Sequence, residues 1–193
     1  MSHKIALLYG SVRTGRLGIR VVHWLERLLN ERGHTTSIVD QKEYALPMLD
    51  APLHFMDPAK VPENVQKIAD ILTDAEGFVV VGGEYNHAIQ PGLSNLIDYF
   101  YKGQFGFKPG LIATYSYGPF GGVRTAVQLR ALLAEVGMVT IPNMVAVGSI
   151  AETLSEAAEP QNPKMNEFAG KAIDEFEFYL RALAAERKNG VPG

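Results

Sequence analysis

Cysteine is absent from all 193 residues of the sequence. Its absence excludes disulfide bonds, a thiolate nucleophile, and metal or iron–sulfur sites with cysteine ligands. Any redox chemistry of this protein must therefore come from a bound cofactor.

Long hydrophobic runs and an excess of charge are also absent. No segment reaches the ~18 consecutive apolar residues of a membrane span, and the beginning of the chain, MSHKIALLYG, has neither the apolar core nor the cleavage site of a secretion signal. The formal net charge is -3 and the isoelectric point is about 6.0, so no basic surface indicates nucleic-acid binding. These absences predict a cytoplasmic protein with no membrane or nucleic-acid partner.

The residues that are present are typical of a soluble globular protein, with 47% hydrophobic and 20% charged. A chain of 193 residues can bury roughly 70% of the surface of its unfolded form around one core. The sequence shows no internal repeat and no low-complexity segment. We therefore predict a single domain over residues 1–193.

Short continuous apolar runs alternate with longer amphipathic runs along the chain. The short runs predict strands at 4–9, 35–39, 77–81, 111–115 and 139–147. The last of these contains Pro142, which belongs on an edge strand or at a bulge. The amphipathic runs predict helices at 18–32, 63–75, 122–136 and 168–183, and one that begins at Pro91. A long proline-containing loop is predicted at 41–62.

This alternation of strands and helices is typical of the α/β class, with a parallel sheet, right-handed crossovers and helices on both faces. Ligands of such sheets bind beyond the carboxyl ends of the strands, where the strand order reverses. The loops that matter therefore follow the first, third and fourth predicted strands, and they begin at Gly10, Gly82 and Ser116.

The first loop, GSVRTGRLG at 10–18, has the composition of an anion site. It joins a strand to the N-terminus of a helix, where free N–H groups and the helix dipole favour negative charge. Ser11 adds a hydroxyl donor, while Arg13 and Arg16 add charged, forked donors that suit a phosphate. The alternative is a glycine-rich turn with two solvated arginines.

Two common phosphate-binding motifs do not fit this loop. Its glycine spacing resembles Walker A, but Arg16 and Leu17 stand where lysine and serine or threonine are required, so a magnesium ligand is missing. The dinucleotide pattern G-x-G-x-x-G is absent because Val12 occupies the second glycine position.

The second loop, GGEYNHAIQPG at 82–92, follows the most apolar strand. Tyr85 offers a ring face, and Asn86 and the backbone offer donors and acceptors that suit the edge of a flat heteroaromatic ring. The alternative is a polar connecting loop with an exposed tyrosine.

The third loop, SYGPFGG at 116–122, contains glycines that let the backbone approach a ligand closely. Ser116 and Tyr117 supply hydroxyl groups. The alternative is a tight turn that prepares the helix that follows. Since all three loops meet at the same edge of the sheet, we favour a common binding site.

Together these loops resemble the NADPH-dependent FMN reductase family, which includes quinone, azo-dye and chromate reductases, over nearly the whole chain. The family's G-S-x-R segment binds the FMN phosphate, its P-E-Y-N segment lines the isoalloxazine ring, and its Y-G-x-x-G-G segment closes over the other edge of the ring. The resemblance and the loops together give these candidate cofactor-binding residues: Ser11, Arg13, Arg16, Leu17, Gly18, Gly83, Glu84, Tyr85, Asn86, Ser116, Tyr117, Gly118, Gly121 and Gly122.

The resemblance implies a flavodoxin-like sandwich with five parallel strands in the order 2-1-3-4-5. It also implies bound FMN, NADPH or NADH as electron donor, and a quinone, azo dye, chromate or free flavin as acceptor. No catalytic acid or base is predicted, because hydride transfer needs none. The sequence departs from the family pattern in two places: Gly83 replaces a proline, and Arg16, Leu17 and Gly18 replace a stretch that contains serine or asparagine.

Two other functions remain as alternatives. A flavodoxin-like electron carrier or redox sensor would bind FMN without NAD(P)H turnover, but such carriers resemble strongly acidic proteins whose phosphate loops are rich in serine and threonine. A nucleotide-binding dehydrogenase without flavin is disfavoured by the missing dinucleotide pattern.

The helix that begins at Pro91 predicts a homodimer or homotetramer. Tyr99 and Tyr101 fall to either side of its apolar stripe at 3.6 residues per turn, and Phe105 follows. This aromatic arc is wider than a sheet face covers, and aromatic residues are enriched in interfaces. Family resemblance also implies pairing with FMN near the interface.

Overall fold

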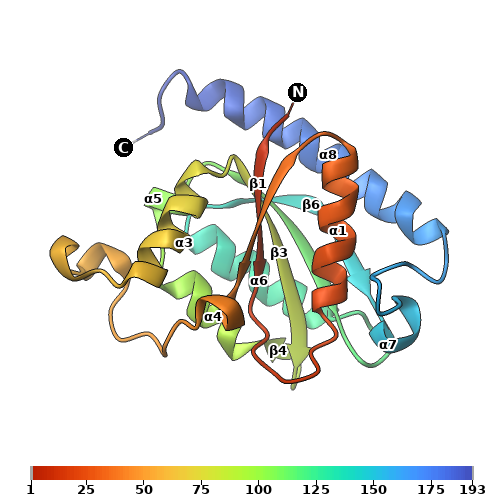
Figure 1. Cartoon of the computed structure of the whole chain (residues 1–193). Helices are drawn as coiled ribbons and strands as arrows, with labels where there is room; N and C mark the ends of the chain where they lie inside the picture. The colour runs from red at the N-terminus through yellow and green to blue at the C-terminus, as the bar shows by residue number, and fades with distance from the viewer. Residues whose placement is uncertain (1, 193) are drawn as a thin grey trace.

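The strands form at the short apolar runs, as expected for strands that are covered on both faces. They are β1 (Lys4–Tyr9), β2 (Thr35–Asp40), β3 (Gly77–Tyr85), β5 (Pro109–Tyr115) and β6 (Val139–Val147). In the computed structural model, which describes residues 2–192, these five strands pair in parallel in the order β2-β1-β3-β5-β6 (Figure 1). This is the predicted flavodoxin-like order, and it reverses between β1 and β3.

A sixth strand, β4 (Ala88–Ile89), was not predicted. β3 continues past the predicted end at residue 81 as far as Tyr85, and it pairs there antiparallel with β4. The two residues between these strands, Asn86 and His87, have φ angles of 51° and 64°. Positive φ at both central residues is what a tight hairpin turn requires, and asparagine adopts it more readily than most residues.

Helices cover the two faces of the sheet because successive side chains of each strand point to opposite faces. One face is covered by α1 (Ile19–Glu31) and α8 (Lys164–Arg187), and the other by α3 (Glu63–Asp74), α4 (Pro91–Asp98) and α6 (Val123–Glu135). Ile5 and Leu7 of β1 belong to the first core, and Ala6 and Leu8 belong to the second. None of the helices within residues 2–192 is both long enough and apolar enough to cross a lipid bilayer.

The α1–α8 contact buries Trp24, whose side chain is 1% exposed. Its indole Nε1 donates a hydrogen bond to Asn166 Oδ1 at 2.8 Å, at the beginning of α8. α8 itself is longer at both ends than the predicted helix at 168–183. The apolar stripe predicted the part of this helix that packs on the sheet. Its ends are polar, so the apolar pattern did not predict where the helix begins and ends.

The predicted loop at 41–62 contains three short helical segments: α2 (Gln41–Tyr44), η1 (Leu53–Phe55) and η2 (Pro58–Lys60). α2 begins because the carboxylate of Asp40 accepts a hydrogen bond from the backbone N–H of Lys42. In the same way, Asp57 caps η2 by accepting from the N–H of Ala59. These caps depend on single aspartates, which apolar periodicity does not detect.

The predicted exposed aromatic patch beyond Pro91 is wrong. α4 ends at Asp98, and a separate helix, α5 (Lys102–Phe105), follows, so a single helical wheel does not describe this segment. Tyr99 is only 3% exposed and Phe105 is fully buried. The half-buried Tyr101 donates its hydroxyl proton to Glu135 at 2.9 Å.

Pro142 lies on β6, which is an edge strand, as predicted. The pairing of β6 with β5 shifts register between Gly110 and Ile112, so the ladder accommodates an irregular residue nearby. After β6 the chain forms α7 (Ile150–Thr153), which lies at the same edge of the sheet as the loop at 10–18 and β4 (Figure 1).

Candidate functional site

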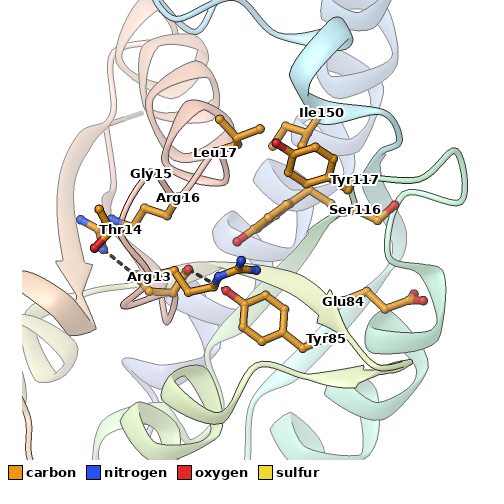
Figure 2. Close-up of a pocket in the computed structure, with 12 residues that line it drawn as sticks. Arg13, Thr14, Gly15, Arg16, Leu17, Glu84, Tyr85, Ser116, Tyr117 and Ile150 are labelled. Atoms are coloured by element: carbon orange, nitrogen blue, oxygen red, sulfur yellow. Dashed lines mark hydrogen bonds between the residues drawn. The ribbon is translucent and has the colours of Figure 1, made fainter.

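A cavity of about 360 Å³ lies at the carboxyl ends of β1, β3 and β5, where the loops were predicted to meet. Its walls come from the first loop, the end of β3, the beginning of the third loop and α7 (Figure 2). The lining residues are Ser11, Arg13, Thr14, Gly15, Arg16, Leu17, Glu84, Tyr85, Tyr115, Ser116, Tyr117 and Ile150.

The first loop leads directly into the N-terminus of α1. Gly18 is the N-cap residue, and it provides no side-chain cap; the first turn of the helix contains no acidic residue. The positive end of the helix dipole is therefore not neutralised by the protein's own side chains at this point. An anion in the cavity would complete this helix end.

Arg13 is exposed and extends across the cavity toward Tyr85 (Figure 2). Its Cζ atom lies 5.5 Å from the centroid of the Tyr85 ring. Among residues 2–192, no carboxylate forms an ion pair with Arg13, so its five N–H donors remain available to a ligand.

Arg16 is arranged differently. Its guanidinium forms two parallel hydrogen bonds, both 2.5 Å long, with the carboxylate of Asp40 at the end of β2. The side chains of Arg16 and Asp40 are only 12% and 5% exposed. Although burial alone would lower the pKa of Arg16, the hydrogen bonds and the charge of Asp40 raise it above its ordinary value, so Arg16 stays charged.

Arg16 also organises the loop from inside, because it donates to the backbone carbonyl of Ser11 at 2.7 Å. Ser11 is buried, and its hydroxyl lies 3.0 Å from the hydroxyl of Tyr85. The first loop and the end of β3 are therefore joined by a direct hydrogen bond.

Glu84 is the one carboxylate among the residues that line the cavity. It is paired with Arg124 of α6 at 2.8 Å and also accepts from the Arg124 backbone N–H at 3.3 Å. Figure 2 shows its carboxylate turned away from the centre of the site. Because this charge is neutralised, the cavity presents an arginine, hydroxyl groups and aromatic rings to a ligand.

In the third loop, Gly118 has open space where a side chain would lie, since a Cβ atom there would meet nothing within 4 Å. Gly121 and Gly122, in contrast, have positive φ angles of 65° and 75° and are needed for the turn into α6. Ser116 donates its hydroxyl to the Gly118 carbonyl at 2.7 Å, while Tyr117 is 77% exposed beside the cavity.

Eight of the fourteen predicted site residues line the cavity: Ser11, Arg13, Arg16, Leu17, Glu84, Tyr85, Ser116 and Tyr117. The others lie next to it without lining it: Gly18, Gly83, Asn86, Gly118, Gly121 and Gly122. Gly83 lies within β3, opposite Tyr115, so it is part of the sheet although the second loop was predicted to begin at Gly82.

Sequence reasoning missed Thr14, Gly15, Tyr115 and Ile150. Thr14 and Gly15 lie within the loop already singled out. Tyr115 reads as the last apolar residue of a strand, and Ile150 as an ordinary core residue, so neither carried a signal of its own.

These side chains fit a flavin mononucleotide. A phosphate requires donors without competing carboxylates, and the first loop offers Arg13, Thr14 and the free end of α1. A flat ring requires aromatic walls, and Tyr85 and Tyr117 provide them.

The open space at Gly118 leads to a prediction. The Gly118→Val side chain would project into free volume, so the apoprotein should keep its stability while flavin binding is strongly impaired. Flavin titration and thermal unfolding of the apoprotein measure the two effects separately. Gly103→Ala, also at a position where a Cβ meets nothing, is the control that should leave both unchanged. Normal flavin content in Gly118→Val would remove the third loop from the site.

Comparison with known proteins indicates the same cofactor. Residues 3–152 match the family model described as NADPH-dependent FMN reductase. An NAD(P)H-dependent FMN reductase of a Nectria species is 34% identical over 143 residues, which are 69% of this chain and 68% of that protein. A quinone reductase of Escherichia coli is 32% identical over 142 residues, covering 69% of this chain and 71% of the relative.

The fold has a close match among solved structures. FerB, a flavoenzyme NAD(P)H:(acceptor) oxidoreductase from Paracoccus denitrificans, superposes with a TM-score of 0.74. The match covers 92% of this chain and 98% of the other, at 21% sequence identity. At that identity the likeness supports the fold alone.

Proposed function

Because this chain belongs to the NADPH-dependent FMN reductase family, we propose that it uses bound FMN to carry electrons from NADPH or NADH to a quinone or a similar small acceptor. The observation that carries this proposal is the cavity at the sheet edge, which lies beside the N-terminus of α1. It contains Arg13, which has no ion-pair partner within residues 2–192, and the aromatic rings of Tyr85 and Tyr117 in its walls. FMN, when bound, supplies the redox chemistry by accepting a hydride and passing the electrons on.

The protein's own residues bind and orient the cofactor. Ser11, Arg13 and the end of α1 hold the phosphate by hydrogen bonds and charge. Tyr85 and Tyr117 border the ring. Backbone N–H groups near Tyr85 and Asn86 would stabilise negative charge on the ring of a reduced flavin.

The remaining predicted residues shape the site. Arg16 and Leu17 hold the first loop in place, the former through its buried pair with Asp40. Glu84 ties the end of β3 to α6 through Arg124. No side chain is assigned as a catalytic acid or base.

The acceptor follows from the relatives, two of whose names describe quinone reduction and FMN reduction. Azo dyes, chromate and free flavin belong to the same class of small electron acceptors. A cytoplasmic location remains a prediction from the sequence.

The decisive experiment combines cofactor and turnover. The purified protein, given excess FMN and desalted, should show flavin absorption bands and should oxidise NADPH or NADH in the presence of a quinone. A panel of quinones, azo dyes, chromate and free FMN then ranks the acceptors. A protein without flavin bands would refute the proposal. Flavin without nucleotide oxidation would favour the electron carrier instead.

A homodimer or homotetramer remains part of the proposal, but Tyr99 does not belong to its interface, because this side chain is buried. The exposed apolar residues near α4 are Met48 and Phe55, which are 79% and 76% exposed. Their segment packs on α4, where the backbone N–H of Leu49 donates to Asn95. Pairing of two copies over this surface would cover both side chains.

Light scattering at micromolar concentration tests this pairing. We expect at least twice the 21.1 kDa mass of one chain. The double variant Met48→Glu with Phe55→Glu should then dissociate to single chains. A wild-type mass of one chain would refute pairing, and a variant that stays paired would move the interface elsewhere.

A further inference from the structure

A group of buried polar side chains adjoins the cavity. The hydroxyl groups of Tyr9 and Tyr115 lie 3.4 Å apart, and Gln90 Nε2 donates to the Tyr115 hydroxyl at 2.7 Å. Tyr9 is fully buried, Gln90 is 1% exposed and Tyr115 is 8% exposed. Of these three residues only Tyr115 lines the cavity. Its phenol therefore connects a buried hydrogen-bond network with the ligand site.

Two glycines make room for the Tyr115 side chain. A Cβ atom at Gly18 would overlap the ring and hydroxyl of Tyr115, and a Cβ at Gly83 would lie 2.8 Å from that hydroxyl. Neither glycine has a positive φ angle, so these positions need the absence of a side chain rather than backbone freedom. Gly18 and Gly83 belong to the two stretches in which the sequence departs from the family pattern. Tyr115 accounts for the glycine at position 18, and Tyr115 together with Gln90 accounts for the glycine at position 83.

The Tyr115 hydroxyl lies at the end of the cavity that is next to the N-terminus of α1. Its hydroxyl occupies the volume in which a side chain of residue 18 would begin. Gly18 is the N-cap of α1, where no side-chain cap is present. The Tyr115 hydroxyl therefore lies at the positive end of this helix, in the wall shared with Ser11 and Arg13.

The hydroxyl of Tyr115 is able to donate to a ligand. It accepts from Gln90, which leaves its own O–H proton free apart from the long 3.4 Å contact with Tyr9. Burial raises the pKa of Tyr115 above its ordinary value, so the phenol keeps its proton at neutral pH. The amide oxygen of Gln90 is buried and has no partner within residues 2–192, so this network is not closed by the protein itself.

We propose that Tyr115 is a further phosphate ligand of the flavin site, whose hydroxyl stands in for the side chain that residue 18 lacks. The inference rests on the proposed function. The phosphate donor then comes from Tyr115 on β5 instead of from the first loop. The glycines at 18 and 83 leave the space that this side chain occupies. Gln90 and Tyr9 are positioning residues, because they hold the phenol without lining the cavity.

The first test compares two flavins on the purified apoprotein. Tyr115→Phe keeps the ring and removes the donor, so FMN should bind about tenfold or more weakly, as expected for a lost hydrogen bond to a charged group. Riboflavin, which has no phosphate, should bind as it does to the wild type. Unchanged FMN affinity, or an equal loss for riboflavin, would overturn the proposal.

The matched control for this test is Tyr179→Phe on α8, which removes a phenol hydroxyl outside the cavity and should leave both affinities unchanged. The melting temperature of each apoprotein is measured alongside, since Tyr115→Phe also deprives Gln90 of its partner. A lower melting temperature with unchanged FMN affinity would assign Tyr115 a structural role only.

The second test asks whether Gly18 and Tyr115 act together. Gly18→Ala should lower both FMN affinity and apoprotein stability in the wild-type background, because the new Cβ would displace the phenol. In a Tyr115→Ala background the same substitution should have a much smaller effect. Gly103→Ala should be silent in both backgrounds.

Independent, additive effects of the two substitutions would overturn the coupling. Should Gly18→Ala alone fail to fold, recovery of folded protein by Tyr115→Ala supports it, and failure to recover contradicts it. A wild-type protein that binds no FMN refutes the proposed function, whereas FMN binding that does not depend on Tyr115 refutes only this inference.

Discussion

Arg13→Ala is expected to weaken FMN binding by about 1.5–3 kcal/mol, the usual contribution of a charge-assisted hydrogen bond. The effect should be direct, because Arg13 is exposed and forms no ion pair within the part of the chain that the structure describes. Its removal leaves no buried charge behind, so the stability of the apoprotein should not change. Titration of the apoprotein with FMN measures the loss.

Two further variants show whether charge or geometry matters at this position. Arg13→Lys keeps the charge but not the forked donors and should recover part of the affinity. Arg181→Ala, which removes a half-exposed arginine from α8, is the control and should bind FMN normally. FMN affinity that is unchanged in Arg13→Ala would show that the first loop does not bind the phosphate.

Arg16→Ala should act mainly on stability. It leaves the buried carboxylate of Asp40 without its partner, and breaking a buried ion pair in this way typically costs about 3–5 kcal/mol. Denaturant unfolding of the apoprotein measures this loss. FMN affinity should also fall, because the Ser11 carbonyl loses the hydrogen bond that holds the first loop.

A double variant separates the effect of the unpaired Asp40 charge from the effect of losing the Arg16 contact with the first loop. Arg16→Met with Asp40→Leu removes both charges and should be more stable than Arg16→Ala, although it loses the cap of α2, which contributes roughly 1 kcal/mol. Full stability of Arg16→Ala would mean that Arg16 faces solvent in solution and is free to contact the phosphate, as the sequence had suggested.

Most of the sheet could be predicted because buried parallel strands leave continuous apolar runs, as residues 77–81 show. The β3–β4 hairpin could not, because its turn at Asn86 and His87 resembles any polar loop until the pairing is seen. The aromatic patch failed for a related reason. A helical wheel assumes that the helix continues, and α4 ends before Tyr99 turns into the core.

The candidate site was predictable where local sequence sets the chemistry, as at Ser11 and Arg13 in the first loop. It was not predictable where a distant residue decides the role of a side chain. Arg16 looked equivalent to Arg13 until Asp40, at the end of another strand, was placed beside it. The role of Tyr115 could not be predicted for the same reason, because the residues around its hydroxyl come from β1, the first loop and the segment before α4.

The burial of Trp24 gives this protein an optical reporter of its own. It is the single tryptophan of the sequence, and it lies roughly 9 Å along α1 from Gly18 at 1.5 Å per residue. Its emission should be blue-shifted in the folded protein and should shift to the red when α1 and α8 separate. Bound flavin absorbs in the region where tryptophan emits, so FMN should quench this emission. Apoprotein folding and cofactor uptake can therefore be followed in one cuvette without any label.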